Sequence, residues 1–310
     1  MLRLLDHAAE LMDLRHPLRE GTVGDMLEYT LRSADRRDNP CRWLAGEADA
    51  GIRMLASSEQ CFFYTPHLFP DMDPVLAKAH ELQYALLPGS GLRSPSFRMA
   101  AVLESFCHLS GDVFGWEQRE NDTLRVFLMD TSGHGIRAGL LAALVKILMD
   151  DLSSVDELPV LAHELNRRLE ACLRISGDVL YAVGVILELR PQALRYVSAA
   201  HPALLLRDVD GEVRALPTAG RPLGVFPAST YELHETALHP GDVLLLSTDG
   251  LLESGNARGE EYGLGRLATA LSRMQGPAMQ VARGIHEHLA GWLDLNTIDD
   301  DVAFMVVEHI

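Results

Sequence analysis

The feature that most constrains this fold is a set of aspartates at the ends of apolar segments that lie far apart in the chain. Asp112, Asp130 and Asp249 each stand at or near the end of such a segment, and Asp300 and Asp301 directly precede the apolar run 302–307. A buried strand holds its terminal residue rigidly, so a carboxylate there is fixed at a sheet edge. A single Asp-Gly after a strand is usually a plain turn, but four such ends in one chain predict that the carboxylates meet.

Carboxylates gathered in a poorly solvated site repel one another and take up protons. A divalent cation removes this penalty, and hard ions such as Mg²⁺ and Mn²⁺ prefer oxygen ligands in octahedral geometry. Two such ions about 3.5–4 Å apart can share a carboxylate and acidify a water until it is a nucleophile near neutral pH. The pattern therefore predicts a two-metal hydrolytic centre built on acids at positions 112, 130, 249 and 300.

From residue 97 onward, short apolar runs alternate with a few long helical patterns. Strands are predicted at 97–103, 124–129, 179–189, 194–199, 203–207, 243–247 and 302–307. Helices are predicted at 136–150, 155–174, 264–274 and 278–293. Strands joined by hairpins, with helices grouped between them, indicate an α+β layered domain.

The first 73 residues are expected to be helical and loop-rich, with helices near 2–12, 23–34 and 42–57 and a loop or linker over 61–73. Asp73-Pro74 can open another helix, because proline suits the first helical position, and this helix would stop near Pro88-Gly89. We therefore expect three parts: 1–73 as a helical regulatory or dimerisation segment, 74–89 as a linker helix, and 90–310 as the catalytic domain.

Composition excludes several classes of partner. The 310 residues carry a formal net charge of −17, so the chain repels phosphate backbones and nucleic acid is not an expected partner. No apolar stretch reaches the roughly 18–20 residues that span a bilayer, and acidic residues at 6, 10 and 13 interrupt any secretion signal. The four cysteines form no C-x-x-C pair. A cytoplasmic protein without membrane insertion is the expectation.

Ordered motifs over residues 80–310 resemble those of the bacterial, SpoIIE-like branch of the metal-dependent (PPM, type 2C) protein serine/threonine phosphatases. The leading helix ends in Leu82-Gln83-Tyr84-Ala85-Leu86-Leu87-Pro88. The metal motifs are Ser110-Gly111-Asp112, Asp130-Thr131-Ser132-Gly133-His134-Gly135, Thr248-Asp249-Gly250 and Asp300-Asp301. Two further matches are Ala199-Ala200-His201-Pro202 and Gly220-Arg221-Pro222-Leu223-Gly224.

This resemblance implies a central antiparallel β-sandwich flanked by helices, with two divalent cations, Mn²⁺ or Mg²⁺, at one edge. It assigns Asp130, the Thr131 carbonyl, Asp249 and Asp300 as metal ligands, and it assigns Asp112 and Asp130 to catalysis, with Asp112 holding metal-bound water. The implied reaction is hydrolysis of phosphoserine or phosphothreonine on a regulatory protein of the anti-sigma-factor antagonist type. Implied partners are that phosphoprotein and a kinase or sensor protein, and a homodimer through the N-terminal helices is a further expectation.

Departures from the family pattern keep a second interpretation open. Cys107, Gly115 and Ala303 stand where the family usually has other residues, and a basic residue common just before the first metal motif is absent. A catalytically weak scaffold that binds within the same signalling circuit is therefore the alternative, and a small-molecule phosphatase is a third. His134 is either a proton donor or a structural turn residue, and His201 is expected to pack at a strand end.

Overall fold

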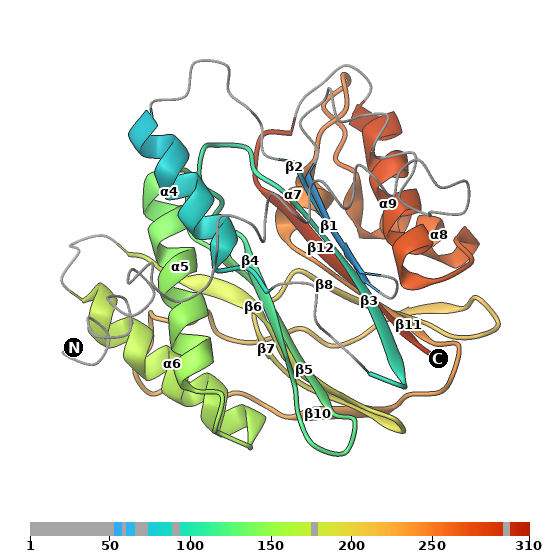
Figure 1. Ribbon diagram of the computed structural model, residues 1–310, viewed down its shortest axis with the longest axis horizontal. Helices are drawn as coiled ribbons and strands as arrows, with labels where there is room; N and C mark the ends of the chain where they lie inside the picture. Colours follow the sequence, from blue (N-terminus) through green and yellow to red (C-terminus); the bar gives the residue numbers. More distant parts are fainter. Residues whose placement is uncertain (1–52, 58–59, 66–73, 89–93, 175–178, 294–297) are drawn as a thin grey trace.

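The computed structural model describes residues 53–57, 60–65, 74–88, 94–174, 179–293 and 298–310. Two β-sheets lie face to face, and helices cover both outer faces (Figure 1). Among the described residues the helices are α4 (Pro74–Ala85), α5 (Ile136–Asp151), α6 (Leu158–Leu173), α7 (Asp249–Glu253), α8 (Gly263–Arg273) and α9 (Ala278–Leu293). This arrangement is the layered α+β domain that the sequence pattern predicted and the β-sandwich that the family resemblance implied.

The first sheet has its strands in the order β1, β2, β3, β12, β11, β8, β9. Their bounds are β1 (Arg53–Ser57), β2 (Gln60–Thr65), β3 (Phe97–Glu104), β12 (Val302–His309), β11 (Val243–Ser247), β8 (Ala203–Arg207) and β9 (Val213–Ala215). Its pairs are antiparallel except β2–β3, which is parallel. Helices α8 and α9 pack on its outer face, so its central strands are apolar on both faces.

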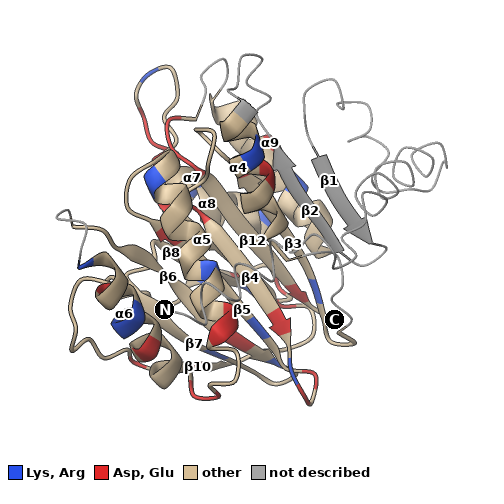
Figure 2. Ribbon diagram, turned by 60° about the vertical axis from the view of Figure 1, so that its left-hand side comes forward, with Lys and Arg blue, Asp and Glu red and all other residues tan. Residues whose placement is uncertain are grey.

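The second sheet is antiparallel throughout, in the order β10, β7, β6, β5, β4. Its strands are β10 (His234–Ala237), β7 (Ala193–Ala199), β6 (Ala182–Arg190), β5 (Leu124–Thr131) and β4 (Val113–Gln118). Helices α5 and α6 pack on its outer face. Figure 2 shows charged residues of both signs on α6, as expected for a helix with one face in solvent.

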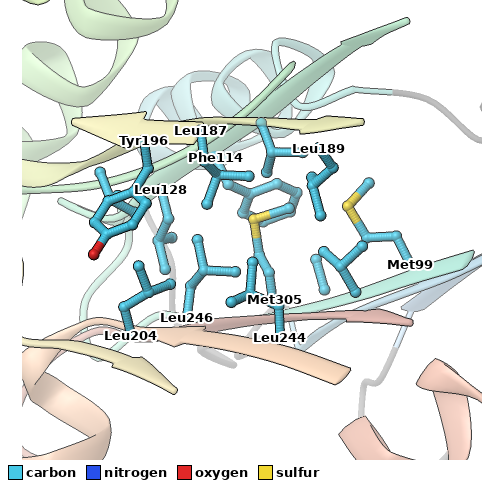
Figure 3. Close-up of a cluster of buried hydrophobic side chains, with 14 of the residues drawn as sticks. Met99, Phe114, Leu128, Leu187, Leu189, Tyr196, Leu204, Leu244, Leu246 and Met305 are labelled. Atoms are coloured by element: carbon cyan, nitrogen blue, oxygen red, sulfur yellow. The ribbon is translucent and has the colours of Figure 1, made fainter. Parts of the chain in front are cut away.

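The main core fills the space between the two sheets (Figure 3). Leu128 and Leu187 point into it from one sheet, and Leu246 and Met305 point into it from the other. All four side chains are fully buried. Two smaller apolar clusters lie under the helices on either side. Burial of this apolar area is the main favourable free energy that holds the strand ends in place.

Most predicted elements are confirmed within a few residues, but the segment before α4 differs. A helix was expected to run to residue 57 and a loop from residue 61, whereas the structure has the hairpin β1–β2 there. Local propensity gives way here to pairing with β3, a contact between segments distant in sequence. The helices expected near 2–12 and 23–34 lie outside the described residues.

Strand β4 was also missed, because its run Val113-Phe114-Gly115-Trp116 is short and contains a glycine. The glycine has a packing reason. A Cβ at Gly115 would collide with the ring of Phe127 on the neighbouring strand β5. The departure from the family pattern at this position is thus accommodated by an aromatic side chain that lies over the glycine.

Replacing Leu246 by alanine tests the packing of the two sheets. We expect Leu246→Ala to lower the free energy of unfolding by about 2–5 kcal/mol, because the cavity lies between sheets that cannot collapse freely. Urea denaturation measures the change. The control is Val209→Ala at a side chain 72% exposed, expected to change stability by about 0.5 kcal/mol or less. Equal losses in both variants would contradict the core described above.

Candidate metal centre

The predicted acids lie at strand ends that the sheet pairing brings together. Asp112 directly precedes β4, and Asp130 lies in the last two residues of β5, which is the neighbour of β4. Asp249 opens α7 just after β11, and Asp300 and Asp301 directly precede β12, the neighbour of β11. In each antiparallel pair, one strand begins where the other ends. Each sheet therefore contributes two acidic segments to one edge of the sandwich.

Asp112 and Asp130 form the buried part of this cluster. Asp112 is 2% exposed, and burial, followed by the charge of Asp130, raises its pKa well above the usual range. Burial, followed by the charges of Asp249 and Asp300, raises the pKa of Asp130 to about 8. The two carboxyl groups lie close enough for each to shift the pKa of the other. Because burial and like charges both disfavour ionisation, the pair resists full ionisation without a counter-charge.

Asp301 has a structural role that the sequence did not assign. Its two carboxylate oxygens accept hydrogen bonds from the amides of Phe106, at 2.7 Å, and Gly111, at 2.6 Å. Burial raises its pKa to about 6, although both amides act to lower it. The carboxylate thus fastens the β12 segment to the turn that carries Asp112. Its neighbour Asp300 is exposed, and burial of its carboxyl group still raises its pKa.

Thr248 links the two sheets at the same place. Its hydroxyl donates to the Asp112 carboxylate at 2.8 Å and accepts a hydrogen bond from the backbone amide of Ala303 at 3.0 Å. Ala303 contributes only its backbone to this link, so the family departure at that position leaves the link intact. A Cβ at Gly250 would collide with the carbonyl oxygen of Asp301. Only glycine allows the Asp249 segment to approach the Asp301 backbone this closely.

Thr131, predicted to offer its carbonyl oxygen, is held on the Asp112 turn. Its amide and its hydroxyl both donate to the Gly111 carbonyl oxygen, at 3.2 and 3.0 Å. Its hydroxyl also lies 3.0 Å from the carbonyl oxygen of Ala138 on α5. The turn that follows Asp130, residues 131–135, is called the metal-motif turn here. It is therefore packed against the first turn of α5 as one unit.

The two histidines of the sequence motifs, His134 and His201, differ in burial. His134 is exposed, its Nδ1 lies 3.9 Å from the Cys107 sulfur, and its charge lowers the pKa of Asp300 and Asp301. Burial raises the pKa of the Cys107 thiol. His201 is 3% exposed, and burial lowers its pKa to about 3, so its ring is neutral. This agrees with the expectation that His201 packs at a strand end.

Gln83 of α4 contacts the centre from outside the sandwich, and the sequence assigned it no such role. Its side-chain amide donates to the Ser110 carbonyl at 2.6 Å and to the Gly139 carbonyl at 3.2 Å, while its oxygen accepts from the Ser110 amide at 2.9 Å. Figure 1 shows α4 lying beside α5. One side chain thus ties α4 both to α5 and to the residues just before Asp112.

The chemistry of the acids fits hard divalent cations. In the part of the chain that the structure describes, no three His, Cys, Asp or Glu side chains are already arranged to enclose a metal ion. The acids nevertheless lie close enough to raise one another's pKa, and their donors are all oxygens. Bound Mg²⁺ or Mn²⁺ would offset the repulsion between these carboxylates.

A family profile described as "Stage II sporulation protein E (SpoIIE)" matches residues 120–310. The chain belongs to this family. The matched region covers Asp130, Asp249 and Asp300, whereas Asp112 lies just before it. The resemblance drawn from the motifs is therefore confirmed at the level of the family.

Relatives of this SpoIIE-family chain carry phosphatase names. "Phosphoserine phosphatase RsbP" of Bacillus subtilis (strain 168) is 26% identical over 149 residues, which cover 47% of this chain and 37% of that protein. The chain thus matches well under half the length of this relative. Among solved structures, the "SiaA-PP2C domain of Pseudomonas aeruginosa" gives a TM-score of 0.67 at 22% identity and covers 76% of this chain and 95% of that one.

A second structural neighbour contains metal. The catalytic domain of serine/threonine protein phosphatase PstP, solved in complex with two manganese ions, gives a TM-score of 0.53 at 18% identity, over 69% of this chain and 99% of that one. These likenesses confirm the PP2C-type fold of the SpoIIE-family chain. Separately, no helix among the described residues is both long and apolar enough to cross a bilayer.

Removing one charge from the cluster should stabilise the metal-free protein. The pKa of Asp130 is raised to about 8 in the folded state, so its contribution to stability is full below its ordinary pKa and is lost as the pH rises through about 8. We expect Asp130→Asn, in excess EDTA, to exceed the parent in stability by about 1–2 kcal/mol at pH 9. The difference should shrink toward pH 5.

Thermal unfolding at a series of pH values measures this effect, and the same scans with Mn²⁺ provide the control. The parent should gain in Tm on addition of Mn²⁺, whereas Asp130→Asn should gain much less. A variant less stable than the parent at pH 9 in EDTA would mean that Asp130 is not under electrostatic strain.

Proposed function

We propose that this chain is a metal-dependent phosphatase that hydrolyses phosphoserine or phosphothreonine on a regulatory protein. The observation that carries the proposal is the junction of the two sheets, where strand pairing brings Asp112 and Asp130 together with Asp249 and Asp300. Membership of the SpoIIE family and the phosphoserine phosphatase name of its relative RsbP support it.

In this proposal two divalent cations would be held by Asp130, Asp249, Asp300 and the Thr131 carbonyl. When bound, Mn²⁺ or Mg²⁺ supplies positive charge for the phosphoryl oxygens and lowers the pKa of water. Asp112 orients the attacking water by accepting a hydrogen bond from it, and Thr248 fixes the Asp112 carboxylate for this task. Asp301 holds the turn in place through Phe106 and Gly111 and takes no direct part.

The proposed substrate is a folded antagonist of an anti-sigma factor, as the family resemblance implies. The net charge of −17 argues against a nucleic acid substrate, because like charges would repel it. The free thiols of Cys107 and Cys172 agree with a cytoplasmic setting. A kinase or sensor partner stays a prediction.

Activity assays separate the phosphatase from the scaffold alternative. With Mn²⁺ present, we expect turnover of p-nitrophenyl phosphate and of a phosphoserine peptide, and we expect Asp130→Asn to lower kcat by about 10³-fold or more, since it would remove a carboxylate proposed to bind metal. Release of inorganic phosphate is the measurement. An Asp242→Asn variant is the control, because Asp242 directly precedes β11 at the end of the strand away from Asp249.

If the parent and Asp130→Asn are equally inactive on both substrates at saturating Mn²⁺ and Mg²⁺, the scaffold interpretation holds and the proposed reaction is wrong. The departures at Gly115 and Ala303 do not by themselves favour that outcome. Both positions are accommodated by packing and by backbone hydrogen bonds, as described above.

We further propose that α4 is the linker between the N-terminal segment and the centre. Three of its side chains bind the stretch 105–110: Gln83 binds Ser110, Tyr84 binds the Ser105 hydroxyl at 2.8 Å, and His80 binds the His108 carbonyl at 2.6 Å. On its outer side α4 exposes Val75 and Leu82, seven residues apart, a spacing that suits contact with another helix of a second copy. The division into parts at 73 and 89 remains a prediction.

Gln83→Ala tests this coupling. Loss of the hydrogen bonds to Ser110 and Gly139 should loosen the turn that carries Asp112, and we expect the affinity for Mn²⁺ to fall about 3–10-fold, within the range for supporting residues of metal sites. Titration of Mn²⁺ followed by thermal shift gives the affinity without requiring turnover. Lys78→Ala, on the exposed side of α4, is the control. Equal affinities in all three proteins would contradict the coupling.

A further inference from the structure

Exposed apolar side chains border the carboxylate cluster on the side of α5. Ala138 is fully buried, and its carbonyl oxygen lies 3.0 Å from the hydroxyl of Thr131, so the first turn of α5 sits directly on the metal-motif turn. On the outer face of that turn, Ile136 is 52% exposed and Leu140 is 64% exposed. Residues four apart share a helix face, so these two side chains form one apolar strip in solvent.

A third exposed side chain, Tyr181, directly precedes β6. Its amide donates to the Ser132 hydroxyl at 3.0 Å and its carbonyl accepts from the Ser132 amide at 2.9 Å, so it lies beside the residue that follows Thr131. Its side chain is 37% exposed. The next residue, Ala182, exchanges two backbone hydrogen bonds with Leu223. The loop around Leu223 is therefore placed next to Tyr181.

That loop presents an aromatic ring and a cation on an anchored backbone. Phe226 is 46% exposed, and the Arg221 guanidinium lies 5.3 Å from the centre of its ring. The loop does not owe its position to these two side chains. Asn166, fully buried in α6, donates to the Phe226 carbonyl at 2.9 Å and accepts from the Gly224 amide at 2.9 Å. Because these bonds already fix the loop backbone, less conformational entropy is lost when a partner binds.

We propose that Ile136, Leu140, Tyr181, Arg221 and Phe226 form a docking surface for the folded phosphoprotein substrate. This inference rests on the proposed function and adds the place where the substrate protein sits. Any protein that brings a phosphorylated residue to the carboxylate cluster must cover the surface beside it. Large exposed apolar groups gathered at one place mark such interfaces, and aromatic and Arg side chains are the usual energetic centres of an interface.

Arg221 gives this surface one charge that complements a phosphorylated partner. The chain has a net charge of −17 and its centre is a cluster of acids, both of which repel a phosphorylated, acidic partner at a distance. Arg221 places a positive charge within the apolar surface, where it can pair with an acidic group near the phosphorylated residue. The surface therefore fits a folded protein with an apolar patch and a carboxylate close to its phosphoserine or phosphothreonine.

The test compares three substrates with three variants. The substrates are a serine-phosphorylated anti-sigma-factor antagonist domain, an unfolded peptide carrying the same phosphoserine, and p-nitrophenyl phosphate, all assayed with Mn²⁺. The variants are Leu140→Gln, Phe226→Ser and Arg221→Glu. Matched controls lie at the opposite end of the sandwich: Val160→Gln for the helix position, Val209→Ser for the loop position, and Arg273→Glu for the charge reversal.

We expect each variant to lower kcat/KM for the folded domain about 5–20-fold, the range for interface residues of this kind. Turnover of p-nitrophenyl phosphate should change about twofold or less, because it does not reach this surface. The controls should match the parent on all substrates. Equal losses on p-nitrophenyl phosphate and on the folded domain would overturn the proposal, since the residues would then act through the metal centre.

Failure of the inference and failure of the proposed function are distinguishable. If the parent hydrolyses p-nitrophenyl phosphate and the folded domain, and the variants do so equally well, the docking surface is wrong and the phosphatase stands. If the parent hydrolyses neither, the proposed function itself is wrong and the docking proposal goes with it. Parent activity on p-nitrophenyl phosphate with none on the folded domain would also overturn the docking proposal. Circular dichroism of each variant excludes unfolding as a cause.

Discussion

Carboxylates from two different sheets are held close together in this protein against their own repulsion. The bonds that hold them cross between the sheets: the Thr248 hydroxyl donates to Asp112, and the Gly111 amide donates to Asp301. These bonds form only when the sheets stack correctly, so the geometry of the centre depends on the apolar core between them. The free energy of burying that core offsets the cost of gathering charges in a poorly solvated place.

The sequence predicts the fold well where each element has a local signature. Strands such as β11 and β12 are unbroken apolar runs because helices cover the outer face of their sheet, and both were placed within two residues. The acids of the centre were found because each lies at or near one end of an apolar run, and two of them, Asp112 and Asp249, lie beside a glycine. Asp112, Asp130, Asp249 and Asp300 do come together, although their assignment as metal ligands remains a proposal.

What the sequence did not predict is what depends on distant contacts. Gln83 belongs to a recognised motif, but nothing in its neighbours shows that its amide reaches Ser110 and Gly139. Thr248 reads as part of a turn until the pairing of β11 with β12 places it against Asp112. The hairpin β1–β2 was missed for the same reason, since strand formation there depends on a partner some forty residues away, β3.

The parallel pairing of β2 with β3 limits how the segment before α4 can be exchanged for another one. Strands β1 and β2 precede α4, yet they share a continuous backbone ladder with the sheet that carries β11 and β12. Exchanging everything before α4 for an unrelated domain would strip β3 of its neighbour and leave its amides and carbonyls open along that side. Such an open strand invites pairing with other chains, so a clean graft would have to keep the hairpin.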